Sequence, residues 1–377
     1  GKHIDDLKPV IAPGNSDSAS LDNAFELFVR GGRNAPMTKC LLIPEAWSNK
    51  TTMDQELRDF YSYCNCVMEQ WDGPAAITAT DGRWVLGAVD RNGLRPMRYT
   101  ITVDGLLIMG SEAGMVPIRE SEIVEKGRLG PGQMIAVDLG AAKLYHDGDL
   151  KKMLATSRPF DEWSKNMTLL DDVIRPETAA DAEYNGAALR QRQVAAGYTL
   201  EELELLLQPM VEDAKEATGS MGDDTPLAVL SDGYRGLHHF FRQSFSQVTN
   251  PPIDSLREYR VMSLKTRLGN LGNILDEDEN QTRLLQLDSP VLTNAGFAAM
   301  RDYMGEAAVE LDCTFRPEKG EHALRRAIYK LQRMAEDAVR GGAAHLILSD
   351  KNIGPGRAAM PMILATGAVH AHLIEEA

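Results

Sequence analysis

Paired strand-like runs joined by tight turns are the feature that most constrains the fold of this chain. Between residues 74 and 145 the sequence is rich in apolar and β-branched residues, and Asp-Gly pairs interrupt it. An Asp-Gly pair favours the backbone angles of a two-residue hairpin turn, so the runs on either side of it are expected to pair antiparallel. The expected pairs are residues 75–80 with 83–89, 98–103 with 106–109, and 133–138 with 142–145. This block is therefore predicted to form an antiparallel sheet.

A helix is predicted on the N-terminal side of this block. Apolar side chains recur every three or four positions over residues 21–29, which is the spacing of one helix face. The Asn, Ser and Asp residues at 15–20 can cap its free backbone N–H groups. Gly31 and Gly32 can end it in a left-handed conformation.

The pattern changes after the sheet. Strand-like sequence ends near Asp149, and the polar residues 150–185 are interpreted as an interdomain connection. Farther on, Thr199-Leu-Glu-Glu202 has the form of a capping box at the start of a helix. Strands are then expected at 227–230 and 345–350, and helices at 323–340 and 361–374. Alternating strands and helices predict parallel βα units.

Length and charge limit the domains and the partners. A chain of 377 residues predicts two domains. With 40 Lys and Arg against 55 Asp and Glu, its formal net charge is −15. Such a surface repels phosphate backbones and anionic lipids, so neither nucleic acid nor a membrane is expected as a partner. Four cysteines are too few for a disulfide scaffold, which is typical of a cytoplasmic protein with reduced thiols.

Asp17 is the candidate binding residue. Ser16-Asp17-Ser18 stands directly before the predicted helix, where an Asp is commonly an N-cap. A carboxylate in such a turn can also bind the ammonium group of a ligand, and the pattern alone leaves both roles open.

Other polar motifs have ordinary structural interpretations. The Gly-rich loop 351–357 lies between a predicted strand and a predicted helix, which suits an anion, but a structural turn is favoured. His370 and His372 diverge on a helix, and Cys64 and Cys66 point about 200° apart, so neither pair is expected to bind a metal. All four cysteines are expected to be buried and structural.

Four motifs resemble the large subunit of glutamate synthase. They occur in the family's order and extend over nearly the whole chain, although Ser255 stands where the family usually has Pro. The motifs are Asn15-Ser-Asp-Ser-Ala-Ser-Leu-Asp22, Asp90-Arg-Asn-Gly-Leu-Arg-Pro96, Gly219-Ser-Met-Gly-Asp-Asp-Thr-Pro226 and Gln247-Val-Thr-Asn-Pro-Pro-Ile-Asp254.

The resemblance implies two domains of mixed α/β and α+β class. Residues 1–165 would be the C-terminal half of a class II glutamine amidotransferase domain, and would supply the antiparallel-sheet part of its αββα N-terminal-nucleophile fold. Residues 166–377 would be the N-terminal part of a central domain with an incomplete, barrel-like βα architecture.

The resemblance also implies a reaction. The whole enzyme makes two glutamates from glutamine, 2-oxoglutarate and two electrons, and channels ammonia inside the protein. Its large subunit holds FMN and a 3Fe–4S cluster. A small flavoprotein subunit adds FAD and 4Fe–4S clusters if the donor is NADPH, and ferredoxin is the alternative donor. Partners of this segment would be the remaining domains and glutamine, and no cofactor, metal or catalytic residue is expected within it.

The family's nucleophile is an N-terminal Cys, whereas this chain begins at Gly1 without an initiator Met, so the segment alone is predicted to be inactive. In related amidotransferases, the Asp of a Ser-Asp-Ser/Thr turn pairs with the α-ammonium of glutamine, which here is Asp17. The 90–96 motif is expected to be a structural hairpin, and loop 247–254 is expected to line the ammonia route. The alternatives are a non-catalytic glutamine-sensing module and a structural scaffold.

Overall fold

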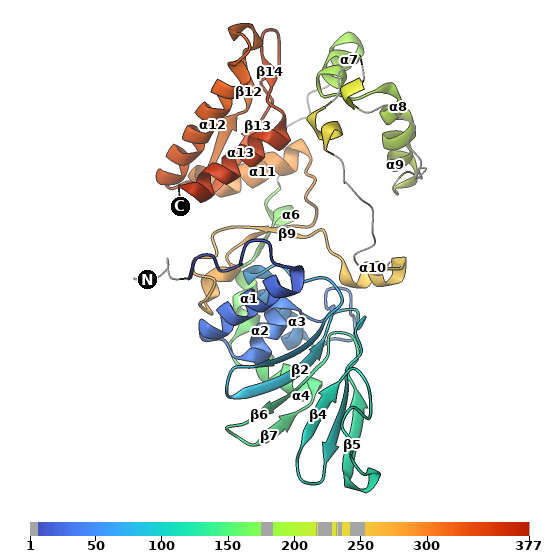
Figure 1. Ribbon diagram of the computed structural model, residues 1–377. Coiled ribbons are helices and arrows are strands. Elements are labelled where there is room, and N and C mark those ends of the chain that lie inside the picture. The colour runs from blue at the N-terminus through green and yellow to red at the C-terminus, as the bar shows by residue number, and fades with distance from the viewer. Residues whose placement is uncertain are drawn as a thin grey trace. The chain divides into compact units, whose positions relative to one another are not determined.

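The chain separates into two units, which the computed structural model describes over most of their length (Figure 1). The first unit contains Gly1–Asp172 and Val248–Val291, and the second contains Val173–Gln247 and Leu292–Ala377. The described residues are 7–174, 184–215, 217, 228–230, 232, 236–241 and 253–376. Two stretches that are distant in sequence therefore fold together in the first unit.

The helices of the first unit begin at the signals that the sequence carries. Helix α1 (Asp17–Arg30) is capped by Ser16, whose hydroxyl accepts a hydrogen bond from the backbone N–H of Ala19, and it ends at Gly31. Asn34 caps the next helix in the same way. The remaining helices are α2 (Ala35–Leu42), α3 (Gln55–Val67), α4 (Asp147–Ala155), α5 (Phe160–Trp163), α6 (Leu170–Val173) and α10 (Ser255–Val261).

All three predicted hairpins are confirmed, but they contribute to two sheets rather than one. The first sheet has the order β1-β2-β6-β7, and the second has the order β4-β3-β5, with every neighbour antiparallel. Strand β5 was not predicted, because its charged sequence lacks the usual strand composition. The strands are β1 (Ala76–Thr80), β2 (Trp84–Val89), β3 (Arg98–Thr102), β4 (Leu107–Gly110), β5 (Ile123–Arg128), β6 (Met134–Asp138) and β7 (Lys143–Tyr145).

Alternation along β2 explains how the layers stack. Trp84, Leu86 and Ala88 belong to a core cluster that also contains residues of α1 to α5. Gly87 faces the other way, and a Cβ atom there would collide with the sulfur of Met109 in β4. Because successive side chains of a strand point to opposite faces, helices cover one face of the first sheet and the second sheet packs on the other.

The second stretch of this unit, Val248–Val291, is called the returning stretch, and it adds a third small sheet. Its order is β8-β10-β9, in which β10 (Leu285–Leu287) is parallel to β8 (Thr168–Leu169) and antiparallel to β9 (Thr266–Leu268). The buried Arg33 donates to the carbonyl oxygens of Ile274 and Asp276, both at 2.7 Å. Polar contacts between the two stretches are thus buried inside the unit.

Two structural predictions for this unit are wrong. Residues 150–173 are not a connection, because α4 and α5 place Leu150, Leu154 and Phe160 in the core. The 90–96 motif is not a hairpin, because the strands before and after it, β2 and β3, belong to different sheets. The motif is a link between two layers.

The second unit contains the predicted βα unit. Strand β11 (Ala308–Asp312) runs parallel to β13 (His345–Ser349), and α12 (Ala323–Arg340) connects them. Leu311, Leu331 and Val369 belong to the core that these elements share with α13 (Met362–Glu375). The short strands β12 (Thr314–Phe315) and β14 (Ala358–Ala359) pair antiparallel.

The capping box at Thr199 and Glu202 is confirmed, since each side chain accepts from the other's backbone N–H. The strand predicted at 227–230 is wrong over its described part, where Ala228–Leu230 forms a 3₁₀ turn. The 219–226 motif lies outside the described residues, as does loop 247–254 except for Ile253 and Asp254. The other helical segments of this unit are α7 (Gly186–Ala195), α8 (Leu200–Glu202), a π-helical turn at Leu203–Leu207, α9 (Gln208–Asp213) and α11 (Asn294–Met304).

Across the described ranges, no helix is long and apolar enough to cross a membrane.

Candidate functional site

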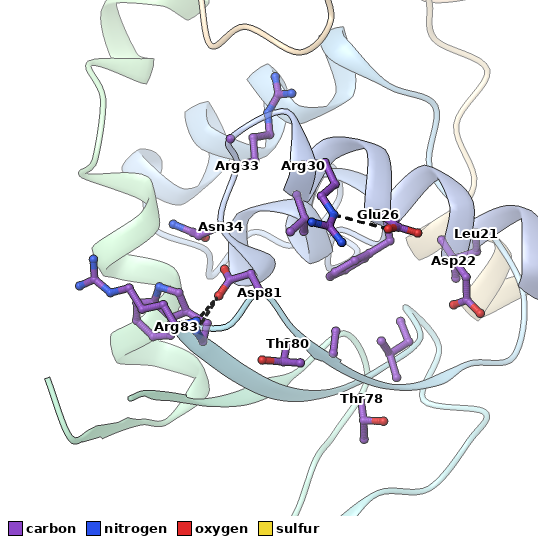
Figure 2. A pocket seen from close by; sticks show the side chains of 16 residues that line it. Leu21, Asp22, Glu26, Arg30, Arg33, Asn34, Thr78, Thr80, Asp81 and Arg83 are labelled. Carbon is purple, nitrogen blue, oxygen red and sulfur yellow. Dashed lines mark hydrogen bonds and ion pairs between the residues drawn. The ribbon is translucent and has the colours of Figure 1, made fainter. Parts of the chain in front are cut away.

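A groove of about 790 Å³ in the first unit lies between α1 and β1 (Figure 2). Apolar side chains of both elements line it, and charged and hydroxyl groups stand around them. The residues from the helix side are Leu21, Asp22, Phe25, Glu26, Val29 and Arg30, and those from the strand side are Ile77, Thr78, Ala79, Thr80 and Asp81. Such a mixed lining suits a small polar molecule with an apolar stem.

Asp81 holds one end of the groove in place. Its carboxylate accepts hydrogen bonds from the backbone N–H groups of Arg83 at 2.9 Å and Trp84 at 2.7 Å, which closes the hairpin turn. The same carboxylate accepts from the backbone N–H of Ala35 at 2.8 Å, at the start of α2. One side chain therefore fixes the β1–β2 turn against the helical layer.

Charged pairs near the groove differ in strength. Arg83 donates two hydrogen bonds to Asp138, at 3.1 and 2.8 Å, and this contact lowers the pKa of the Asp138 carboxyl. Arg30 and Glu26 are 3.5 Å apart on the exposed face of α1, where an ion pair contributes little. The sequence analysis did not single out these residues, although the i, i+4 spacing of Glu26 and Arg30 was a signal for their pairing.

Asp17 occupies the first position of α1, one turn before the helix reaches the groove at Leu21. Ser16, not Asp17, is the N-cap, so the capping role weighed for Asp17 is wrong. The side chain of Asp17 is exposed, and among the described residues no hydrogen bond or ion pair engages its carboxylate. Asp17 lies outside the groove lining, and its carboxylate is available to a ligand.

Asp90 organises the 90–96 motif. It is 2% exposed, and its carboxylate accepts from the backbone N–H groups of Asn92, Leu94 and Arg95, each at 3.0 Å. It also accepts from the backbone N–H of Ala75 at 3.1 Å, directly before β1. The motif is thus a structured loop tied to the strand that forms the groove.

A buried polar cluster joins α2, α4 and the turn at Gly132, and the sequence analysis missed it. Lys151 contacts Glu45 at 2.6 Å and Asp147 at 2.9 Å. Burial alone would lower the pKa of Lys151, but the two carboxylates outweigh it and raise that pKa. Lys39, also fully buried, donates to the carbonyl oxygen of Gly132 at 2.8 Å. Lys39 lies in an apolar run, which was the available signal that its side chain would be buried.

The four cysteines are buried, as the sequence analysis expected. Cys40, Cys64 and Cys313 are 0% exposed and Cys66 is 5% exposed. Burial raises the pKa of each thiol, to about 11 for Cys66. A buried thiol with a raised pKa is a poor nucleophile and a poor metal ligand at neutral pH.

The polar motifs of the second unit have structural partners. Loop 351–357 is a turn in which the Arg357 guanidinium contacts the carboxylate of Asp312 and the hydroxyl of Thr314. His372 contacts Glu336 at 3.1 Å. Within the part of the chain that the structure describes, no three His, Cys, Asp or Glu side chains group closely enough to hold a metal ion.

Comparison with known proteins identifies the class to which this architecture belongs. The family model of class II glutamine amidotransferases matches residues 1–163, which include the helical layer and both antiparallel sheets. The model of the glutamate synthase central domain matches residues 191–377. The chain is therefore an amidotransferase segment followed by a glutamate synthase central-domain segment, as the resemblance of its four motifs implied.

Comparison with individual proteins shows which enzymes within this class the chain is similar to. The chain is 64% identical over 376 residues to the NADPH glutamate synthase large chain of Azospirillum brasilense, covering 99% of this chain and 25% of that protein. It is 42% identical over 380 residues to ferredoxin-dependent glutamate synthase 2 of Synechocystis sp., covering 98% of this chain and 24% of that protein. It is 39% identical over 388 residues to the NADH glutamate synthase of Schizosaccharomyces pombe, covering 100% of this chain and 18% of that protein.

The chain belongs to the glutamate synthase large-subunit family, which confirms the resemblance seen in its four motifs. It spans about a quarter of the length of the bacterial relatives that it matches.

Proposed function

We propose that this chain contributes to glutamine binding and interdomain coupling in a glutamate synthase large subunit, and that Asp17 binds the substrate. The observation that carries the proposal is the exposed carboxylate of Asp17, which no described residue engages, at the N-terminal end of the helix that lines the groove. A carboxylate in this position can accept charge-assisted hydrogen bonds from the α-ammonium of glutamine.

The chain's own thiols support a binding role rather than a catalytic one. All four are buried, so none can attack the side-chain amide of a glutamine in solution. Hydrolysis would then use a nucleophile from another part of the large subunit, while this segment orients the substrate. This division agrees with the prediction that the segment alone is inactive.

The proposed reaction is that of the whole enzyme. Glutamine, 2-oxoglutarate, two electrons and two protons give two glutamates, and the ammonia released at the amidotransferase site is the nitrogen that reaches 2-oxoglutarate. FMN and a 3Fe–4S cluster would carry the electrons. The described residues do not fit such a cluster, because their thiols are buried and no group of three metal ligands is present among them. We assign both cofactors to other domains of the large subunit.

Partners and location follow from the same proposal. The remaining domains of the large subunit would surround this segment, and the electron donor would be either a small flavoprotein subunit or ferredoxin. The small subunit would carry FAD and 4Fe–4S clusters. We place the protein in the cytoplasm, and we place the sequence boundary between its amidotransferase and central segments at residue 165.

Replacing Asp17 tests the proposed binding role. In the full-length large subunit, Asp17→Asn removes the negative charge with little change of shape. Losing one charge-assisted contact to the substrate should raise the glutamine KM about 10- to 100-fold. The rate with ammonia as the nitrogen source should stay unchanged. Steady-state assays with each nitrogen source measure both effects.

Asp22→Asn is the matched control, because Asp22 is exposed on the same helix and lines the groove. If Asp17 binds glutamine, the Asp22 variant keeps the wild-type KM. A raised KM in the Asp22 variant alone would move the ammonium site into the groove and refute the role of Asp17.

A further inference from the structure

Two side chains from the amidotransferase match contact the last turn of α10, a helix that lies in the central-domain match. The Nη2 atom of Arg91 donates to the carbonyl oxygen of Val261 at 2.6 Å. The amide of Asn49 donates to the carbonyl oxygen of Tyr259. The last four carbonyls of a helix have no partner within the helix, so these donors satisfy groups that would otherwise need water.

Arg91 is fixed from its other side by the structured loop. Its neighbour Asp90 is held by four backbone N–H groups, and one of them, from Ala75, directly precedes β1. Strand β1 forms one side of the groove. A continuous set of bonded groups therefore leads from the groove through Asp90 and Arg91 to α10.

The environment of Arg91 is costly for a purely structural residue. The side chain is 8% exposed, and within the described residues its Nε atom is buried without a hydrogen-bond partner. A buried charge with incomplete hydrogen bonding is often less favourable than an apolar side chain of similar size. The hydrogen bond to α10 therefore comes at a desolvation cost that an apolar side chain would not carry.

We propose that Arg91 is a positioning residue that couples the groove between α1 and β1 to α10, so that glutamine hydrolysis stays matched to the use of ammonia. This inference rests on the proposed function. The rigid Asp90 loop transmits a shift of β1 to Arg91, and Arg91 transmits it to the carbonyl end of α10. Loss of the Arg91 contact leaves both ends folded and removes the link that runs through the Asp90 loop.

The test uses Arg91→Met in the full-length large subunit with its electron donor. In the wild type, one 2-oxoglutarate is consumed for each glutamine hydrolysed. In the variant, we expect about two- to tenfold more glutamine to be hydrolysed per 2-oxoglutarate consumed, because the two events are no longer linked. Hydrogen exchange of residues 255–262 should become less sensitive to added glutamine. The rate with free ammonia should stay at the wild-type level.

Arg95→Met is the matched control, because Arg95 lies in the same loop with an exposed side chain. If Arg91→Met does not fold, Arg91→Lys is measured in its place, because it keeps a cation at the site but lacks the guanidinium that donates to the Val261 carbonyl oxygen. A consumption ratio equal to that of the Arg95 variant would overturn the inference. A wild type that makes no glutamate from glutamine would instead refute the proposed function.

Discussion

Lys39 is fully buried, and its amine donates to the carbonyl oxygen of Gly132. Burial lowers the pKa of Lys39 from its usual 10.5 to about 8. Between these two values the unfolded chain holds a proton that the folded chain has released. The contribution of Lys39 to the free energy of unfolding therefore rises with pH across this window, by roughly 3 kcal/mol in total.

Comparing the wild type with Lys39→Met isolates this contribution. The thiols titrate in the same window with the opposite sign. Both proteins carry Cys40→Ala, because the Cys40 thiol interacts with Lys39, and the other three thiols cancel in the difference. Urea unfolding at pH 7.5 and 9.5 should show the protein that keeps Lys39 gaining stability relative to the variant at the higher pH. Lys165→Met, at an exposed lysine, should show no such change. A difference that is constant with pH would mean that burial does not lower the pKa of Lys39.

At the scale of elements, the turn at Gly132 sets how the strand layer meets the end of α2. Its φ is +69°, and a Cβ atom there would stand 2.9 Å from the backbone Cα of Glu45. Gly132→Ala should lower the free energy of unfolding by about 3 kcal/mol, through left-handed strain and a backbone clash. Gly105→Ala is the control, since φ is +82° and nothing lies within 4 Å, so only the strain of about 1 kcal/mol is expected. If both variants lose the same unfolding free energy in urea, the backbone at Glu45 moves enough to relieve the clash with the Cβ atom of residue 132.

Local signals explain which elements could be predicted. The Asp-Gly hairpins, the Ser16 cap and the Thr199 capping box depend on neighbours in sequence, and all of them form. Strand β5 was missed because its charges are tolerated by a sheet whose outer face is exposed. The Asp90 loop was taken for a hairpin because the pairing of β2 with the distant strand β6, and not with β3, depends on tertiary packing.

The candidate site also combines features that depend on local sequence with features that depend on tertiary packing. Asp17 was found through a motif, and its place at the start of α1 follows from the local cap. The groove, the Lys39 and Lys151 cluster and the contact of Arg91 with α10 arise from tertiary packing. Apart from the i, i+4 pair of Asp147 and Lys151, these contacts join residues from separate elements, so no spacing in the sequence encodes them.

At the scale of the whole molecule, residues 253–291 pack with the amidotransferase segment although they lie within the central-domain match. They cover Arg33 and Tyr63, and β10 pairs with β8. A fragment of residues 1–172 should therefore melt about 10 °C below a fragment of residues 1–291, because it exposes apolar surface worth several kcal/mol. Thermal unfolding followed by circular dichroism measures this difference. Thr282→Val in the longer fragment removes the hydrogen bond from Thr282 to the Trp163 carbonyl oxygen. This variant should lower the melting temperature by a smaller amount. Equal melting temperatures for the two fragments would show that the amidotransferase segment reaches its full stability without the returning stretch. In that case α10 would lie against this segment without stabilising it.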